Sequence, residues 1–144
     1  MLAYDAYAEM VLLMALTMAS FVAFGIGTSY EVQARKDGAP RTRWAARVCL
    51  GLGWLLLGIG VASVVIFCTT TGARWLESTW FASGMVALAL IPRWIAWFAA
   101  REPSAGSVAR WAYVLLVGAV IVAFVATSCA GGWWLGEALD AWRR

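Results

Sequence analysis

Four long stretches of the chain carry no charged side chain, and this feature constrains the fold more than any other. They are Met10–Tyr30, Val48–Ala73, Ser78–Pro92 and Trp111–Gly136, and the sequence contains no histidine. The charged residues gather near the chain ends and in the joints between these stretches. A bilayer core about 30 Å thick needs roughly 20 apolar residues per helix. The pattern therefore predicts four membrane crossings.

The composition supports the same interpretation. Of the 144 residues, 63% are hydrophobic and 13% are charged, whereas a soluble domain carries about 25% charged residues. Only helices satisfy their backbone groups within lipid without closing a barrel, and short joints make successive helices antiparallel neighbours. We expect one all-α integral membrane domain over 1–144, an antiparallel bundle of four transmembrane helices. The expected spans are about 9–30, 44–70, 79–100 and 111–135.

The basic residues predict an orientation. Lys and Arg gather in cytoplasmic loops, and the first joint, Glu31–Arg47, holds five that we expect to anchor the chain at the cytoplasmic headgroups: Arg35, Lys36, Arg41, Arg43 and Arg47. The third joint, Arg101–Arg110, is also basic, whereas Met1–Glu9 carries only acidic charges. We predict an inner-membrane protein with both termini outside and the first and third joints in the cytoplasm. The arginines at 143 and 144 argue mildly against this orientation.

Small residues recur at helical spacing and predict close helix packing. The first span carries Ala15, Ala19, Ala23 and Gly27; the second carries the pairs Gly51/Gly58 and Gly53/Gly60; the fourth carries Ala119, Ala123, Thr127 and Gly131. Each series lines one face of its helix. Two interpretations stay open: packing within one chain, or contact of one series with another chain.

Arg93, directly after Pro92, is the one charge out of place inside an expected span, since Glu9 and Arg47 lie near the ends of theirs. Pro92 lacks a backbone N–H and should kink the third span. An arginine at membrane depth is a candidate functional site. The alternatives are snorkelling to the headgroups, contact with a lipid headgroup or partner, and a pore-lining charge.

The C-terminal tail and the cysteines carry weaker signals. Leu135, Leu139 and Trp142 are spaced as on one helix face, which predicts a short C-terminal interfacial helix. The three cysteines, Cys49, Cys68 and Cys129, are scattered and fit small apolar packing, with a bridge between Cys68 and Cys129 as an alternative.

The residue types that are missing narrow the function. Without histidine or clustered cysteines, we expect no haem site, no zinc site and no other cofactor. Without an acid deep within a span, a proton-coupled transporter is not expected. We therefore predict that the chain is not an enzyme, has no catalytic residues and does not bind nucleic acid.

Three functional interpretations remain. The leading one is a non-enzymatic accessory subunit or oligomeric scaffold, whose partners are the bilayer and either itself or other membrane subunits. The chain also resembles phage holins and exclusion proteins in size, helix count and small-residue faces, which implies a self-assembling permeability protein. It is similar in the same general way to small four-helix flippase families, which implies lipid or polyprenyl handling through headgroup attraction to the basic joint.

Overall fold

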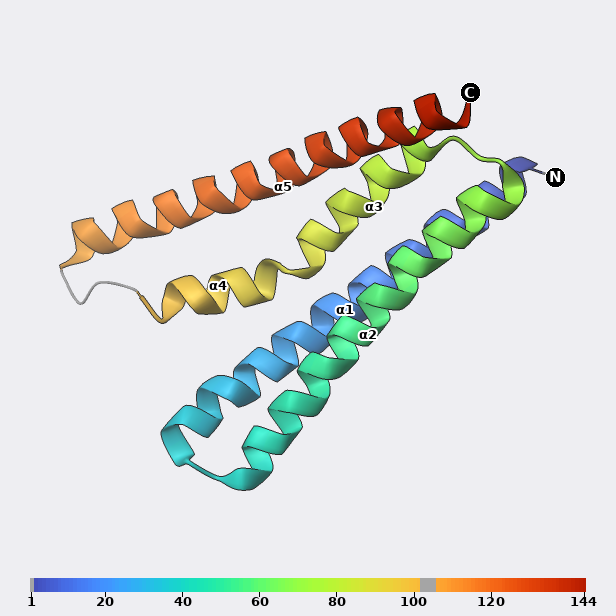
Figure 1. Cartoon of the computed structure of the whole chain (residues 1–144). Helices are drawn as coiled ribbons and strands as arrows, with labels where there is room; N and C mark the ends of the chain where they lie inside the picture. Colours follow the sequence, from blue (N-terminus) through green and yellow to red (C-terminus); the bar gives the residue numbers. More distant parts are fainter. Residues whose placement is uncertain (1, 102–105) are drawn as a thin grey trace.

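The computed structural model describes residues 2–101 and 106–144, and for residues 2–6 and 107 it describes the backbone alone. The described chain is helical almost throughout (Figure 1). The helices are α1 (Leu2–Asp37), α2 (Pro40–Thr71), α3 (Trp75–Ala89), α4 (Ile91–Ala99) and α5 (Ser107–Arg143). With α3 and α4 counted as one broken span, four helices are long and apolar enough to cross a membrane.

The helices form an open arrangement. α1 and α2 run antiparallel as one pair, α3 and α4 lie against this pair, and α5 packs on the other side of α3 (Figure 1). Among the described residues, no Cα of α5 comes within 8 Å of a Cα of α1 or α2. We call the end that holds both termini the terminal end, and the end where α1 turns into α2 the turn end.

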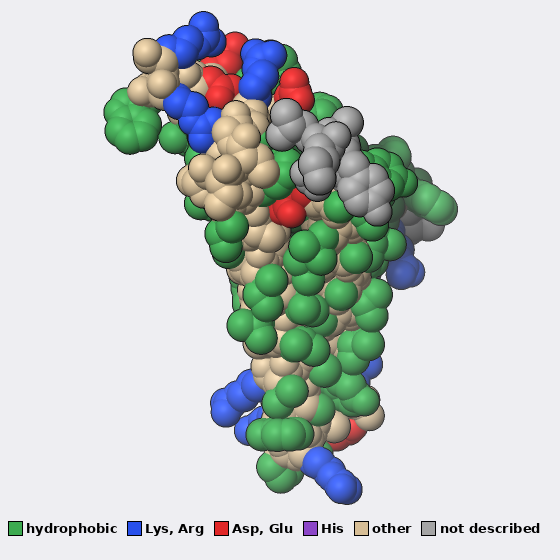
Figure 2. Space-filling model, turned by 90° about the vertical axis from the view of Figure 1, so that its right-hand side faces the viewer, with side chains coloured by type: hydrophobic (Ala, Val, Ile, Leu, Met, Phe, Trp, Pro, Cys, Tyr) green, Lys and Arg blue, Asp and Glu red, His purple; other side chains and the backbone are tan. Residues whose placement is uncertain are grey.

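Hydrophobic side chains cover the middle of the face drawn in Figure 2, while most charged side chains gather toward its upper and lower ends. Over the whole molecule, several large apolar side chains are more than half exposed, among them Leu55, Ile66, Leu115 and Val122. The helices therefore keep much of their apolar surface on the outside.

The turn between α1 and α2 is much shorter than the predicted joint. α1 continues to Asp37, Gly38 adopts a left-handed φ of 66°, and α2 begins at Pro40. Glycine has no Cβ to oppose that φ, and proline is favoured at the first helical position. The predicted joint Glu31–Arg47 is too long, because its Lys, Arg and Glu residues are good helix formers and extend both helices.

The α1–α2 pair packs large side chains against glycines. The ring of Phe24, which is fully buried, lies against Gly53, and Leu50 lies against Gly27. Further toward the terminal end, Leu13 lies over Gly60. Small residues on one helix thus make room for large residues of the other. Such close packing is expected of helices in lipid, where no hydrophobic effect drives apolar helices together.

Only part of each predicted small-residue series lies in this interface. The buried members are Ala23, Gly27, Gly53 and Gly60. The exposed members are Ala15, Ala19, Gly51 and Gly58. The buried face of α1 also carries three hydroxyl residues that sequence reasoning did not select: Thr17, Ser20 and Thr28.

The third span is broken at Leu90, two residues before Pro92, as the proline predicts. The Leu90 N–H donates to the carbonyls of Val86 and Ala87, both at 3.3 Å, and α4 begins at Ile91. Pro92 donates no hydrogen bond, so the regular ladder stops here. The change of direction carries Arg93 and the rest of α4 along α1.

α3 and α5 meet through two glycines. A Cβ at Gly132 would overlap Ser83 Oγ, and one at Gly136 would overlap Leu76 Cα and Thr79 Oγ1. The Thr79 hydroxyl donates to the Gly132 carbonyl at 2.8 Å. The two backbones therefore approach so closely that only glycine fits, as in small-xxx-small helix pairs.

The predicted packing series of the fourth span does not take part in this contact. Ala119, Ala123, Thr127 and Gly131 are all exposed. Ala123 and Gly132 are nine residues apart, about two and a half helical turns, so they lie on opposite sides of α5. The face of Ala123 and the face of Gly132 both carry small residues. The sequence alone therefore does not indicate which of the two faces meets α3.

The prediction of a separate interfacial helix at the C-terminus is wrong. α5 continues without a break to Arg143 and ties down the start of α3. The Asp140 carboxylate accepts the N–H groups of Trp75 at 2.9 Å and Leu76 at 3.1 Å. Arg143 donates to the carbonyls of Ala73 at 2.9 Å and Cys68 at 2.6 Å.

The three cysteines are free thiols. Cys68 is fully buried in the core at the terminal end, and Cys129 on α5 faces Gly84 on α3. The alternative of a bridge between Cys68 and Cys129 is therefore not realised.

Candidate functional site

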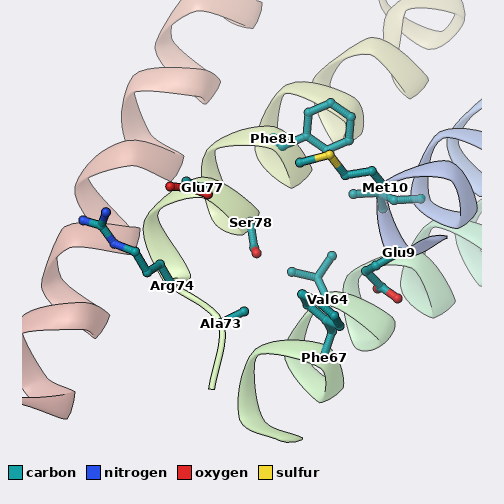
Figure 3. Close-up of a pocket in the computed structure, with 10 residues that line it drawn as sticks. Glu9, Met10, Val64, Phe67, Ala73, Arg74, Glu77, Ser78 and Phe81 are labelled. Carbon is teal, nitrogen blue, oxygen red and sulfur yellow. The ribbon is translucent and has the colours of Figure 1, made fainter. Parts of the chain in front are cut away.

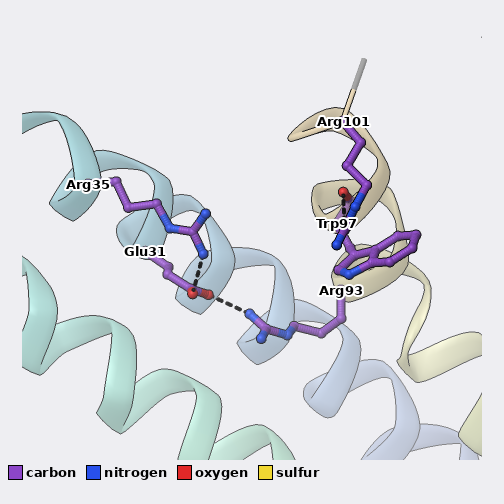
Figure 4. A network of polar contacts seen from close by, with 5 residues as sticks. All are labelled: Glu31, Arg35, Arg93, Trp97 and Arg101. Atoms are coloured by element: carbon purple, nitrogen blue, oxygen red, sulfur yellow. Dashed lines mark hydrogen bonds and ion pairs between the residues drawn. The ribbon is translucent and has the colours of Figure 1, made fainter. Parts of the chain in front are cut away.

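A group of charged and aromatic side chains joins α1 to α4 near the turn end (Figure 4). We call it the α1–α4 cluster, and it consists of Glu31, Arg35, Arg93, Trp97 and Arg101. Arg93 Nη1 on α4 donates to Glu31 Oε2 on α1 at 2.6 Å. Arg35 Nη2, one turn further along α1, donates to the other oxygen of the same carboxylate at 3.0 Å. Glu31 therefore holds two guanidinium groups, one from each helix.

Helical spacing explains why these side chains meet. Residues three or four apart lie on one helix face, and Thr28, Glu31 and Arg35 follow this spacing on α1. Arg93 and Trp97 follow it on α4, with Arg101 just beyond. Glu31 and Arg93 each lie six residues before the end of their helix, at Asp37 and Ala99. At 1.5 Å per residue, both charges sit about 9 Å inside the helix end.

Arg101 is held differently from the other two arginines. Its guanidinium carbon lies 3.6 Å from the centroid of the Trp97 ring, in cation–π contact. Its Nη1 donates to the Trp97 carbonyl at 3.4 Å. Trp97 thus places a third positive charge beside the ion pairs of Glu31.

The cluster borders a cleft of about 440 Å³ between α1 and α4. Three guanidinium groups and one carboxylate line it, so positive charge is in excess by two. The side chains of Arg93 and Glu31 are 38% and 33% exposed, so the ion pair is open to this cleft. The Thr28 residue, 7% exposed, also lines it, and its Oγ1 is buried with no hydrogen-bond partner.

The structure thus gives Arg93 a partner that sequence reasoning missed. The sequence places Glu31 in the first joint, because the apolar run ends at Tyr30, and does not predict that it faces α4. The missed signal is the spacing of Glu31 and Arg35, a favourable pair on one helix face. No comparable feature of the sequence predicts the direction that α4 takes after the break at Leu90.

The five predicted anchor residues separate into three groups. Arg35 belongs to the α1–α4 cluster. Arg43 and Arg47 line a neighbouring hollow between α1 and α2, together with Glu31 and Arg35. Lys36 and Arg41 are exposed at the turn end.

A smaller cavity, of about 80 Å³, lies at the terminal end between α1, α2 and α3 (Figure 3). Glu9 from α1, Phe67 from α2 and Ser78 from α3 are among its lining residues. Glu9 Oε1 is buried without a hydrogen-bond partner. The cavity has space for a few waters, and its two other charged lining residues, Glu77 and Arg74, lie on the opposite wall from Glu9 (Figure 3).

The cleft between α1 and α4 and the smaller cavity at the terminal end differ in the chemistry that they offer. Within 2–101 and 106–144, no group of three or more His, Cys, Asp or Glu side chains is placed to hold a metal ion. The α1–α4 cluster offers guanidinium forks, whose geometry matches carboxylates and phosphates. It is the site that we consider functional.

Comparisons of the chain with models of known protein families, with curated proteins and with solved structures gave no match.

Proposed function

We propose that the protein is a non-enzymatic integral membrane scaffold that assembles with a second copy of itself through the outer face of α5. The observation that carries the proposal is the exposure of the series Ala119, Ala123, Thr127 and Gly131. In the most apolar part of α5, no residue is buried within the chain.

The character of this face supports a helix as its neighbour rather than lipid alone. Four small residues at four-residue spacing leave a shallow groove along α5, and such grooves let two helix backbones approach closely. The same series on a second copy is complementary to it under two-fold symmetry. The Thr127 hydroxyl donates to the Ala123 carbonyl at 2.8 Å, so it brings no unsatisfied donor into the contact.

The proposed orientation follows the charges. Arg35, Lys36, Arg41, Arg43 and Arg47 all lie on the parts of α1 and α2 that meet at the turn end. This excess of basic residues supports a cytoplasmic turn end and an outward-facing terminal end. Single-cysteine variants at the turn end and at the terminal end test this orientation separately from assembly. In intact cells, an impermeant thiol reagent should label only the cysteine at the terminal end.

The assembly is tested with Ala123→Leu. A leucine in the middle of the series would keep the two helices apart, at a cost of about 1–3 kcal/mol, which weakens association by about 5-fold to 150-fold. We expect the wild-type protein to be a dimer in mild detergent by light scattering, and Ala123→Leu to be mostly monomeric.

The matched control is Ala62→Leu, the same change at an exposed position of α2. It should leave the dimer intact. A wild-type protein that is monomeric in detergent and in nanodiscs, and that co-purifies with no other membrane protein, would contradict the scaffold proposal. Equal loss of the dimer in both variants would remove α5 as its interface.

A further inference from the structure

We propose that the cleft of the α1–α4 cluster is a binding site for an anionic phosphate group, supplied by the headgroup of a membrane phospholipid. This site lies on α1 and α4, away from the assembly face of α5, so it goes beyond the proposed function and is tested separately.

The arrangement of charge is the first argument. Glu31 neutralises one charge while it holds the guanidinium groups of Arg93 and Arg35 from two helices at 2.6 and 3.0 Å. Arg101, held on the Trp97 ring, supplies a third guanidinium. The cleft therefore presents two uncompensated positive charges on arms that are already fixed. Arginine forks bind phosphate oxygens by paired, charge-assisted hydrogen bonds.

The Thr28 hydroxyl is the second, independent argument. The residue lines the same cleft and is 7% exposed, and its Oγ1 is buried without a hydrogen-bond partner among the described residues. A buried hydroxyl without a hydrogen bond is costly. A rotation of the Thr28 side chain about χ1 would turn this hydroxyl toward the cleft, where a phosphate oxygen would accept its hydrogen bond.

The depth of the site favours a lipid as the source of the phosphate. Glu31 and Arg93 lie about 9 Å inside their helix ends, with Trp97 beside them. Tryptophan is enriched where headgroups meet acyl chains. A phospholipid whose phosphate is not balanced by a headgroup cation matches the surplus positive charge better than a zwitterionic lipid does.

The experiment measures lipid binding to the purified full chain by native mass spectrometry. Phosphatidylglycerol and phosphatidylcholine are added separately, and inorganic phosphate is added as a competitor. We expect phosphatidylglycerol to bind preferentially, with one tight site per chain, and to be retained in the presence of inorganic phosphate. Displacement by inorganic phosphate would also support a phosphate site, but with free phosphate as its ligand.

Four variants test whether the named residues form the site. Arg93→Gln and Arg101→Gln should each weaken phosphatidylglycerol binding about tenfold, the effect of losing one strong polar contact. Arg41→Gln is the matched control, because it removes the same charge from an exposed position at the same end of the molecule. It should change binding less than twofold if the site is local.

Thr28→Val is the fourth variant and removes the hydroxyl while keeping its shape. We expect weaker phosphatidylglycerol binding with no loss of thermal stability in lipid-free detergent, because no protein partner is lost. Arg101→Gln likewise leaves the Glu31 ion pairs intact, so the test does not depend on Arg93 variants that fold poorly. Equal binding of both lipids, or equal weakening by Arg41→Gln and Arg101→Gln, would overturn the proposal.

Discussion

The two antiparallel helix pairs of this protein are packed by different means. α1 and α2 fit large side chains over glycines along their length, with Leu13 on Gly60 and Phe24 on Gly53. α3 and α5 touch backbone to backbone at Gly132 and Gly136. The first kind of contact can adjust by moving a side chain, whereas the second cannot.

The packing of α5 also changes along its length. Toward the terminal end, α5 is fixed to α3 by its glycines and by Asp140 and Arg143. Toward the turn end, α4 has turned aside, and Trp94 and Phe124 fill the space with ring centroids 5.0 Å apart. The break near Pro92 thus divides the packing against α5 into two halves. We call the half at α3 the closed half and the half at α4 the looser half.

The largest effect is expected at the backbone contact. Gly136→Ala would place a Cβ against Leu76 Cα and Thr79 Oγ1, and we expect a loss of about 2–3 kcal/mol in the free energy of unfolding. Denaturant unfolding in detergent, followed by circular dichroism, measures it. Gly118→Ala is the control, because a Cβ there meets no atom within 4 Å. Equal stability of the two variants would refute the close contact.

A smaller effect is expected where the tail holds the closed half. Arg143→Ala removes the hydrogen bonds to Cys68 and Ala73. We expect a loss of about 1–2 kcal/mol, since hydrogen bonds from charged groups are stronger than neutral ones but this side chain is exposed. The same unfolding measurement on Arg144→Ala should show no change. A similar loss in both variants would indicate a general charge effect at the C-terminus.

The looser half should respond less. Tyr113 donates to the Phe98 carbonyl at 2.7 Å, which is a direct polar link between α5 and the end of α4. Tyr113→Phe removes this bond and should cost about 1 kcal/mol or less. Tyr30→Phe, at an exposed position on α1, is the reference for the loss of a hydroxyl. A loss well above that of Arg143→Ala would show that α4 and α5 are joined more firmly than the ends of α3 and α5 at the terminal end.

The smallest effect is expected in the α1–α2 pair. A Cβ at Gly60 would lie 3.2 Å from Leu13 Cδ1, the end of a flexible side chain. The small clash is offset by the higher helix propensity of alanine, so Gly60→Ala should change stability by less than about 0.5 kcal/mol. A loss comparable to that of Gly136→Ala would remove the distinction between adjustable and rigid contacts.

The sequence allowed part of this structure to be predicted. The charge-free stretches located four long apolar helices, and Pro92 located the break in the third. The extents of α1 and α2 were underestimated, because helix formers such as Glu31 and Arg35 continue a helix beyond its apolar part. Membrane crossing and orientation stay predictions.

The choice of packing faces was less predictable. α5 carries small residues on two opposite sides, at Ala123 and at Gly132, and only the second side meets α3. Which side is covered depends on the direction in which α3 and α4 run, and that direction follows from tertiary contacts. The pairing of Arg93 with Glu31 was missed for the same reason, since it requires α4 to lie along α1.

The position of α5 on α3, away from the α1–α2 pair, is the central claim and has a direct test. A Cβ at Gly84 would lie 3.0 Å from Cys129 Sγ, about the distance from Cβ to the partner sulfur across a disulfide. In a chain with Cys49 and Cys68 replaced by alanine, we expect Gly84→Cys to form a disulfide with Cys129 under mild oxidation. Gly58→Cys on α2 should remain unlinked. A Gly84→Cys variant that stays reduced while Gly58→Cys links to Cys129 would contradict the open arrangement.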